Sequence, residues 1–141
     1  MVLITRETDY ALRVLRALSD GQQRTAGEIA AGQLVPRQFA YKIIKKLSRG
    51  GLVTITRGAD GGCRLAADLR QVSLYDLMTA MEEDAGIVAC MEPGYPCPWR
   101  EAHGGCAIHC GLAQVQARLD EALRTHDLHS LIFGPAQVPS P

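Results

Sequence analysis

Residues 90–110 limit what this chain can fold into more than any other stretch. They hold four of its five cysteines and two of its four histidines. Glycine and proline recur through the segment, so regular structure is not expected before about Cys106. A loop of this length is usually functional or disordered, and thiolate and imidazole groups bind soft or borderline metals and iron–sulfur clusters. The sequence therefore predicts a cofactor-binding loop. The alternative is a set of idle or structural thiols.

The remaining composition is that of one small domain, or of a small domain with an appended helix. The chain has 141 residues, and 47% of them are hydrophobic, which is enough for a core. No apolar run approaches the ~20 residues needed to cross a bilayer, and the N-terminus is too charged for a signal peptide. We expect a cytoplasmic protein with no membrane partner. In that compartment, five cysteines indicate metal binding or redox chemistry rather than a disulfide framework.

The formal net charge of zero conceals a strong asymmetry along the chain. Residues 36–64 hold seven lysines or arginines against Asp60 alone, a balance of +6. Residues 65–141 hold four basic and ten acidic residues, a balance of −6, and residues 1–35 hold four of each. Basic charge concentrated in one segment is the usual electrostatic footprint of nucleic-acid binding.

Three helices are expected in the first 50 residues. An apolar stripe runs through 6–19, Thr25–Glu28 matches a capping box that opens a short helix stopped near Gly32, and Pro36 opens a third helix that ends near Arg49. The polar face of the third helix has no acidic residue, whereas an ordinary solvated face mixes both signs. This face comprises Arg37, Gln38, Tyr41, Lys42, Lys45, Lys46 and Arg49.

A glycine-tipped hairpin follows this basic helix. Residues 52–56 and 63–66 read as two short strands, and the turn at 57–62 contains three glycines. The fold class is therefore mainly α with a small β-wing, a winged helix-turn-helix whose third helix enters the major groove of double-stranded DNA. The first turns of that helix are expected to reach base edges and its end to meet phosphate. The base-contacting residues are Arg37, Gln38, Tyr41 and Lys42, and the phosphate-contacting residues are Lys45, Lys46 and Arg49.

A second helical region flanks the cysteine loop. A capping box at Ser73–Asp76 opens a helix that reaches about Glu83. Apolar residues from Ile108 to Ala122 recur every three or four positions and form a seam that His126 closes. That seam fits a dimerisation helix, because a DNA-binding protein with one recognition helix usually needs a two-fold partner to contact two half-sites. The predicted parts are a DNA-binding domain (1–83), a cysteine loop (84–106), a dimerisation helix (107–133) and a disordered tail (134–141).

Together these features resemble the Rrf-two family of bacterial regulators over residues 2–133. The resemblance rests on the helix-turn-helix, the wing motif Leu-Val-x-x-x-Arg57-Gly-x-x-Gly-Gly62, the three-cysteine loop and the long helix that follows. It implies a homodimeric transcription factor on a pseudo-palindromic operator, with Arg57 as a minor-groove arginine. It also implies an iron–sulfur cluster held by Cys90, Cys97 and Cys106.

The fourth ligand of that cluster stays open. Cys106-x-x-His109 matches the cluster-regulator branch of the family, and the segment from Leu3 to Asp9 resembles the nitric-oxide-sensing branch, in which Asp9 of the partner subunit would complete the site. Cys110 is the candidate from ligand chemistry alone. The spacing Cys-x6-Cys-x8-Cys is longer than is common in the family, so the resemblance does not decide between a 2Fe–2S and a 4Fe–4S cluster.

The function predicted from the sequence is a repressor-type regulator whose operator binding is controlled by a cluster that senses redox state, nitric oxide or iron supply. One alternative keeps the DNA-binding regulator but gives it a structural zinc or a thiol–disulfide switch. A remote alternative is a small redox or electron-transfer protein, which leaves the basic helix and the wing unexplained. The chain contains no P-loop, dinucleotide fingerprint or hydrolase constellation, so we do not expect an enzyme.

Overall fold

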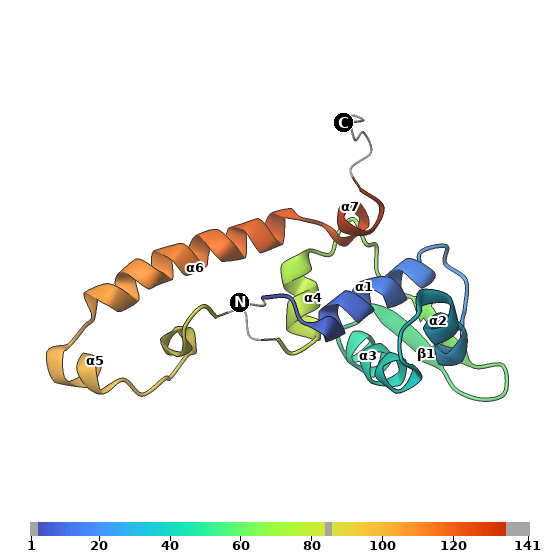
Figure 1. Ribbon diagram of the computed structural model, residues 1–141, viewed down its shortest axis with the longest axis horizontal. Helices are drawn as coiled ribbons and strands as arrows, with labels where there is room; N and C mark the ends of the chain where they lie inside the picture. The colour runs from blue at the N-terminus through green and yellow to red at the C-terminus, as the bar shows by residue number, and fades with distance from the viewer. Residues whose placement is uncertain (1–2, 84–85, 135–141) are drawn as a thin grey trace.

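The computed structural model describes residues 3–83 and 86–134 and forms a body with one long projecting arm (Figure 1). The body contains α1–α4, the two strands and α7, whereas α6 leads outward to α5 and the cysteine loop. In chain order the elements are α1 (Arg6–Ala17), α2 (Ala26–Gln33), α3 (Arg37–Arg49), β1 (Val53–Thr56), β2 (Gly62–Leu65), α4 (Leu74–Ala80), the 3-10 turn η1 (Ala89–Met91), α5 (Pro98–His103), α6 (Ala107–Thr125) and α7 (Leu128–Phe133).

Short side chains cap the helices of the body where the sequence predicted. The Thr25 hydroxyl accepts a hydrogen bond from the Glu28 amide at 3.1 Å and opens α2. Ser73 and Asp76 form both bonds of a capping box, at 3.1 and 2.9 Å, and open α4. Each bond satisfies a donor that the first helical turn leaves without a backbone partner.

The wing is a two-stranded antiparallel sheet in which Val53 pairs with Leu65 and Thr56 with Gly62. A further antiparallel bridge joins Arg24 to Cys63 through backbone bonds of 2.9 and 2.8 Å, so the α1–α2 connection lies against the wing. The predicted fold class, mainly helical with a small β-wing, is confirmed.

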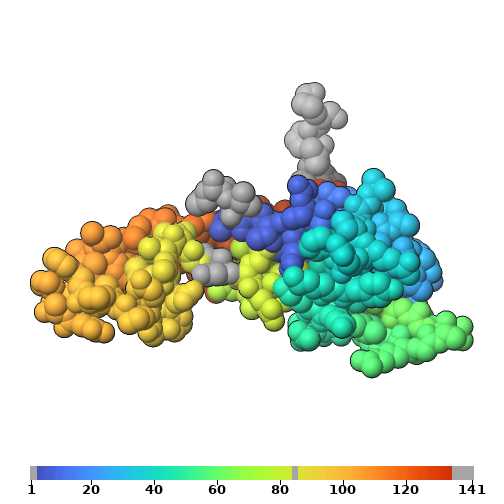
Figure 2. All heavy atoms as spheres, turned by 60° about the horizontal axis from the view of Figure 1, so that its bottom comes forward, coloured from blue at the N-terminus to red at the C-terminus, as the bar shows by residue number. Residues whose placement is uncertain are grey.

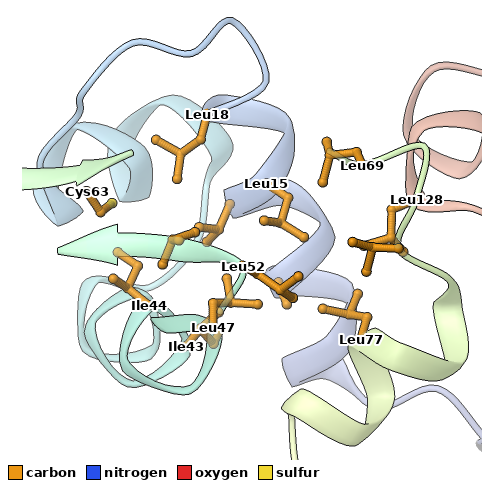
Figure 3. Close-up of a cluster of buried hydrophobic side chains, with 14 of the residues drawn as sticks. Leu15, Leu18, Ile43, Ile44, Leu47, Leu52, Cys63, Leu69, Leu77 and Leu128 are labelled. Atoms are coloured by element: carbon orange, nitrogen blue, oxygen red, sulfur yellow. The ribbon is translucent and has the colours of Figure 1, made fainter. Parts of the chain in front are cut away.

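One hydrophobic cluster unites the body (Figure 3). Side chains from α1, α3 and α4 meet those of the wing, and Leu128 enters from the C-terminal side. The fully or nearly fully buried members include Ala11, Val14, Leu15, Leu18, Ile43, Leu47, Leu77, Met81 and Leu128. The apolar stripes expected for the first and third helices are therefore the surfaces that form the core.

Two helices end at left-handed residues that are not glycine. The second helix ends within one residue of the predicted stop near Gly32. It continues to Gln33, and Leu34 takes the left-handed conformation at φ 55°. The helix from Ser73 ends at Ala80 rather than near Glu83, because Glu82 is also left-handed, at φ 59°. Non-glycine residues seldom adopt this conformation, so tertiary context rather than local preference ends both helices.

The C-terminal part corrects the predicted single helix over 107–133. Helix α6 ends at Thr125, and Asp127 caps the separate helix α7 by accepting from the Ser130 amide at 2.9 Å. The break lets Leu128 enter the core and lets its amide donate to the Val72 carbonyl at 2.9 Å. The predicted tail 134–141 lies outside the described residues apart from Gly134.

The cysteine segment is also more ordered than a plain loop. It contains η1 and the short helix α5, which begins at Pro98 and ends before Gly104 at φ 74°. Proline at the first helical position and a left-handed glycine after the last are favourable ends for a short helix. No helix in the described part of the chain is long and apolar enough to cross a membrane.

Candidate functional site

The recognition helix α3 presents most of the predicted DNA-contacting residues to solvent. Its apolar side is buried through Ala40, Ile43, Ile44 and Leu47. The exposed residues on the other side are Arg37, Gln38, Tyr41, Lys42, Lys45 and Arg49, and Arg57 is exposed on the wing. The structure therefore keeps these cations together on one side of the body.

A groove of about 620 Å³ separates α3 from the wing. Tyr41 and Lys45 line it from the helix, and Ile55 and Arg57 line it from the hairpin. Cationic and aromatic side chains around one concave surface are suited to the sugar-phosphate backbone and to base edges of a duplex. This groove is the candidate DNA interface.

Crowded backbone at the wing tip explains why position 61 is a glycine. A Cβ atom at Gly61 would lie 2.4 Å from the Thr56 carbonyl oxygen and 2.8 Å from that of Gly58. Both neighbours are backbone atoms of the same turn, so a side chain at this position has to open the hairpin.

We expect Gly61→Ala to weaken DNA binding about tenfold, or about 1.4 kcal/mol, because the clash displaces Arg57 from the groove. Fluorescence anisotropy with a duplex selected from a random library measures the change. Gly32→Ala is the matched control, since a Cβ there meets nothing within 4 Å. Equal affinities of the two variants would show that the wing does not contact the duplex.

One predicted phosphate contact has a different environment. Lys46 has only 15% of its side chain exposed, and its Nζ lies 3.1 Å from Glu7 Oε2 and 3.3 Å from the Met81 carbonyl oxygen. Lys42 Nζ donates to Glu7 Oε1 at 2.6 Å while remaining 55% exposed. The polar face of α3, which has no acidic residue of its own, therefore meets Glu7 of α1. A helical wheel of α3 alone does not reveal this contact.

The arm that carries the cysteines has no core of its own. Within the described stretch 86–122, every side chain is exposed or half-buried. Figure 2 shows the yellow and orange part of the molecule projecting from the body. The exposed apolar residues on α6 include Ile108 at 73% and Val115 at 51%, both on the predicted seam. Exposed apolar side chains that gather on one helix face often mark an interaction site.

Two of the predicted cysteine ligands converge at the start of α6. His109 Nδ1 lies 3.4 Å from Cys90 Sγ, and the His109 amide donates to Cys106 Sγ at 3.4 Å. Cys106 is the N-cap of α6, so its sulfur lies at the positive end of a 19-residue helix. Thiolate is the form of cysteine that binds metal, and imidazole is a common ligand beside it.

The third predicted ligand, Cys97, lies apart from this pair at the start of α5. The nearby Arg100 backbone amide lowers the pKa of the Cys97 thiol, and the Arg100 guanidinium adds to the effect. Trp99 stacks on His103 with ring centroids 3.9 Å apart. Neither α5 nor this stack was predicted from the sequence, although Pro98 was a signal for a helix start.

The other candidate ligands are dispersed. Asp9 lies on α1, where its carboxylate pairs with Arg13 at 3.1 Å and with Arg6 at 3.9 Å. Cys110 is exposed one turn after Cys106. Cys63 is buried in the wing, and burial raises the pKa of its thiol. All five cysteines are free thiols.

The described residues do not form a closed metal site within one chain. Among residues 3–83 and 86–134, no three His, Cys, Asp or Glu side chains lie close enough to hold a metal ion. Cys90 and Cys106 each contact His109. Cys97 and Asp9 lie outside this group.

Comparison with known proteins agrees with a DNA-binding body that carries a cysteine arm. Residues 4–133 match the model of the Rrf2 family, described as an iron-dependent transcriptional regulator. The chain belongs to the Rrf2 family. It is also 35% identical over 136 residues to the HTH-type transcriptional repressor NsrR of Streptomyces coelicolor, covering 94% of this chain and 89% of that protein. The resemblance seen in the sequence motifs is confirmed.

Solved structures share the Rrf2 fold with this chain. CymR, the global cysteine regulator of Bacillus subtilis, has a TM-score of 0.66 at 19% identity and covers 94% of this chain and 97% of its own. IscR of T. potens has a TM-score of 0.61 at 17% identity, with coverages of 98% and 93%. At these identities the likeness shows the fold alone. As an Rrf2 protein, the chain is a DNA-binding transcription regulator and not an enzyme.

Proposed function

We propose that this Rrf2 regulator is a homodimeric repressor, acting in the cytoplasm, whose binding to a pseudo-palindromic operator is controlled by an iron–sulfur cluster. The observation that carries the proposal is the composition of the arm. Thiols crowd a stretch, 86–122, that has no buried side chain and connects to a compact DNA-binding body. The relative named as a transcriptional repressor favours repression over activation.

The donor set fits such a cluster. Cys90, Cys97 and Cys106 offer three half-buried thiols, two of which lie at helix N-termini. Thiolates are the usual ligands of both 2Fe–2S and 4Fe–4S clusters, and one non-thiolate ligand is chemically compatible with either. When bound, the cluster supplies redox and ligand-exchange chemistry that responds to oxidants, nitric oxide and iron supply. The fourth ligand is Asp9 of the partner subunit or His109, with Cys110 behind both.

Dimerisation through α6 follows from its exposed seam. The seam residues Ile108, Leu112, Val115 and Leu119 recur at intervals of three and four and are half-buried or exposed in one chain. Pairing two copies would cover this surface and place two recognition helices on two half-sites. Regulators of this family typically act as dimers.

The test is a comparison of DNA binding by cluster-loaded and cluster-free protein. Coupling between two sites in one protein is typically worth 1–3 kcal/mol, so we expect the two forms to differ roughly 5- to 150-fold in affinity for a duplex selected from a random library. The comparison uses anaerobically prepared dimer at one protein concentration. Equal affinities would contradict control by the cluster while leaving DNA binding itself established.

A second candidate function has a specific observation in its favour. The lowered pKa of Cys97, next to Arg100, would suit a thiol–disulfide switch without metal. A Cys₃His zinc site is chemically sound as well. The visible spectrum of anaerobically isolated protein separates these possibilities. A brown protein supports the cluster, a colourless protein with stoichiometric zinc supports the zinc site, and a colourless metal-free protein supports the switch.

A further inference from the structure

One carboxylate in the body holds two lysines of the recognition helix. Glu7 accepts from Lys42 at 2.6 Å through Oε1 and from Lys46 at 3.1 Å through Oε2. The two lysines are one helical turn apart, so both reach the same carboxylate from one side of α3. The bond from Lys42 is the main reason that the pKa of Glu7 lies below its usual value. Glu7 is therefore charged at neutral pH.

The two lysines differ in what else they can reach. Lys42 is 55% exposed next to the groove residues. The sequence predicted a base-edge contact for Lys42, but a lysine this exposed can also neutralise a phosphate. Lys46 is 15% exposed and also contacts the Met81 carbonyl oxygen at 3.3 Å and Glu82 Oε2 at 3.9 Å. Met81 and Glu82 directly follow α4, and we call these two residues the root of the cysteine arm because the chain leads from them toward it. Lys46 therefore joins the recognition helix to the root of that arm.

Because Glu7 lies on α1, its bonds to Lys42 and Lys46 join the recognition helix to the N-terminal end of α1. Glu7 lies in the first turn, which Thr5 caps through the Thr8 amide at 3.4 Å. A displacement of this turn changes the distances from Glu7 to both lysines, whereas a displacement of Met81 and Glu82 acts on Lys46 alone. A negative charge 2.6 Å from Lys42 Nζ also offsets part of the attraction between α3 and phosphate.

We infer that Glu7 is a positioning residue that limits the cations α3 offers to DNA, and that Lys46 links this restraint to the root of the cysteine arm. With Glu7 in place, Lys42 divides its bonds between the carboxylate and phosphate. When the first turn of α1 moves away, Lys42 becomes fully available. The link to the arm rests on the proposed function, whereas the restraint on Lys42 does not.

The experiment is the salt dependence of DNA binding by Glu7→Gln. Gln keeps the shape and an acceptor oxygen but removes the charge. Each additional phosphate that a lysine neutralises steepens the slope of log K against log salt by about 0.9, so two half-sites should add about 1.8. The variant should then bind more tightly at low salt and lose about twelve-fold more affinity than wild type between 50 and 200 mM salt.

Two controls keep this test decisive. Glu121→Gln makes the same charge change on the arm and should leave the slope at the wild-type value. Lys42→Gln should reduce affinity more in the Glu7→Gln background than in wild type, because Lys42 is restrained only when Glu7 is charged. A Glu7→Gln protein with reduced affinity and an unchanged slope overturns the proposal, because Glu7 would then merely support the fold. Should that variant not fold, Glu7→Asp, which shortens the side chain, replaces it.

Lys46 provides the test of the link to the arm. Lys45→Gln should lower the slope by about 0.9 per half-site, whereas Lys46→Gln should leave the slope unchanged and reduce the difference between cluster-loaded and cluster-free protein. A slope lowered equally by both variants would make Lys46 a phosphate contact and overturn its linking role. If wild type already shows no difference between the two forms, the proposed sensing fails, and the Glu7→Gln slope still decides the restraint.

Discussion

Replacing Cys106 with serine is expected to abolish the visible absorption of anaerobically isolated protein. Cys106 is the N-cap of α6, and its sulfur accepts a hydrogen bond from the His109 amide at 3.4 Å. The ring of the same histidine contacts Cys90 Sγ. A hydroxyl is a poor substitute for thiolate at an iron–sulfur cluster. Serine is, however, a favoured N-cap residue. The variant should therefore keep α6 while it loses the ligand.

Cys110→Ser is the matched control for this experiment. Cys110 is exposed one turn further along α6 and ranks behind Asp9 and His109 as the fourth ligand, so the same chemical change there should retain the spectrum. Loss of the spectrum in this variant would make Cys110 the fourth ligand. Cys90→Ser and Cys97→Ser should each behave like Cys106→Ser. Full absorption in any of these three variants would remove that residue from the ligand set, and circular dichroism shows whether the helix content has stayed constant.

The fourth ligand is decided by a pair of further variants. Loss of the native spectrum in Asp9→Asn with retention in His109→Gln would assign the ligand to Asp9 of the partner subunit. The reverse pattern would assign it to His109. Asp9 pairs with Arg13 and Arg6 in one chain, so Arg13→Gln also tests whether that ion pair competes with a ligand role.

Leu128→Ala is expected to reduce the free energy of unfolding by about 2–5 kcal/mol. The Leu128 side chain has no exposed surface and belongs to the main core cluster with residues of α1 and α4. Truncation would leave a cavity that the surrounding helices can fill only in part. Urea unfolding followed by circular dichroism measures the change, at one protein concentration because the proposed dimerisation would contribute to apparent stability.

Leu131→Ala, three residues later in α7, is the control for the same chemistry. Leu131 is 43% exposed, so its truncation should change stability by about 0.5 kcal/mol or less. Similar losses in both variants would mean that α7 does not pack into the body as described. A large loss confined to Leu128 would establish that the chain returns from the arm to complete the core.

Local signals in the sequence predicted most of the elements. Thr25 and Ser73 marked the starts of α2 and α4, because a capping bond reaches only three residues. The β-branched residues and glycines of 52–66 marked the wing, because strand pairing across a short turn is also local. The ends of helices were predicted less well, since Leu34 and Glu82 adopt left-handed conformations that their residue types do not favour.

The sequence likewise predicted some features of the candidate site and missed others. The basic face of α3 and the cysteine spacing were readable from residue type and helical period. The reach of Lys46 to Glu7 and Met81 was not, because these contacts join residues 39 and 35 positions apart. The contact between Cys90 and His109 spans 19 positions and depends on where η1 and α6 begin.

The amino-acid sequence by itself determined the winged helix-turn-helix, its basic reading face and a cysteine segment placed before a long apolar seam. Those properties follow from interactions within about four residues or across one turn, which pattern and capping residues encode directly. Only the tertiary structure decided that Leu128 returns to the core, that Glu7 pairs with two lysines of the recognition helix and that Cys90 and Cys106 both contact His109. These depend on distant segments packing together, and residue type alone does not specify which distant partner is chosen.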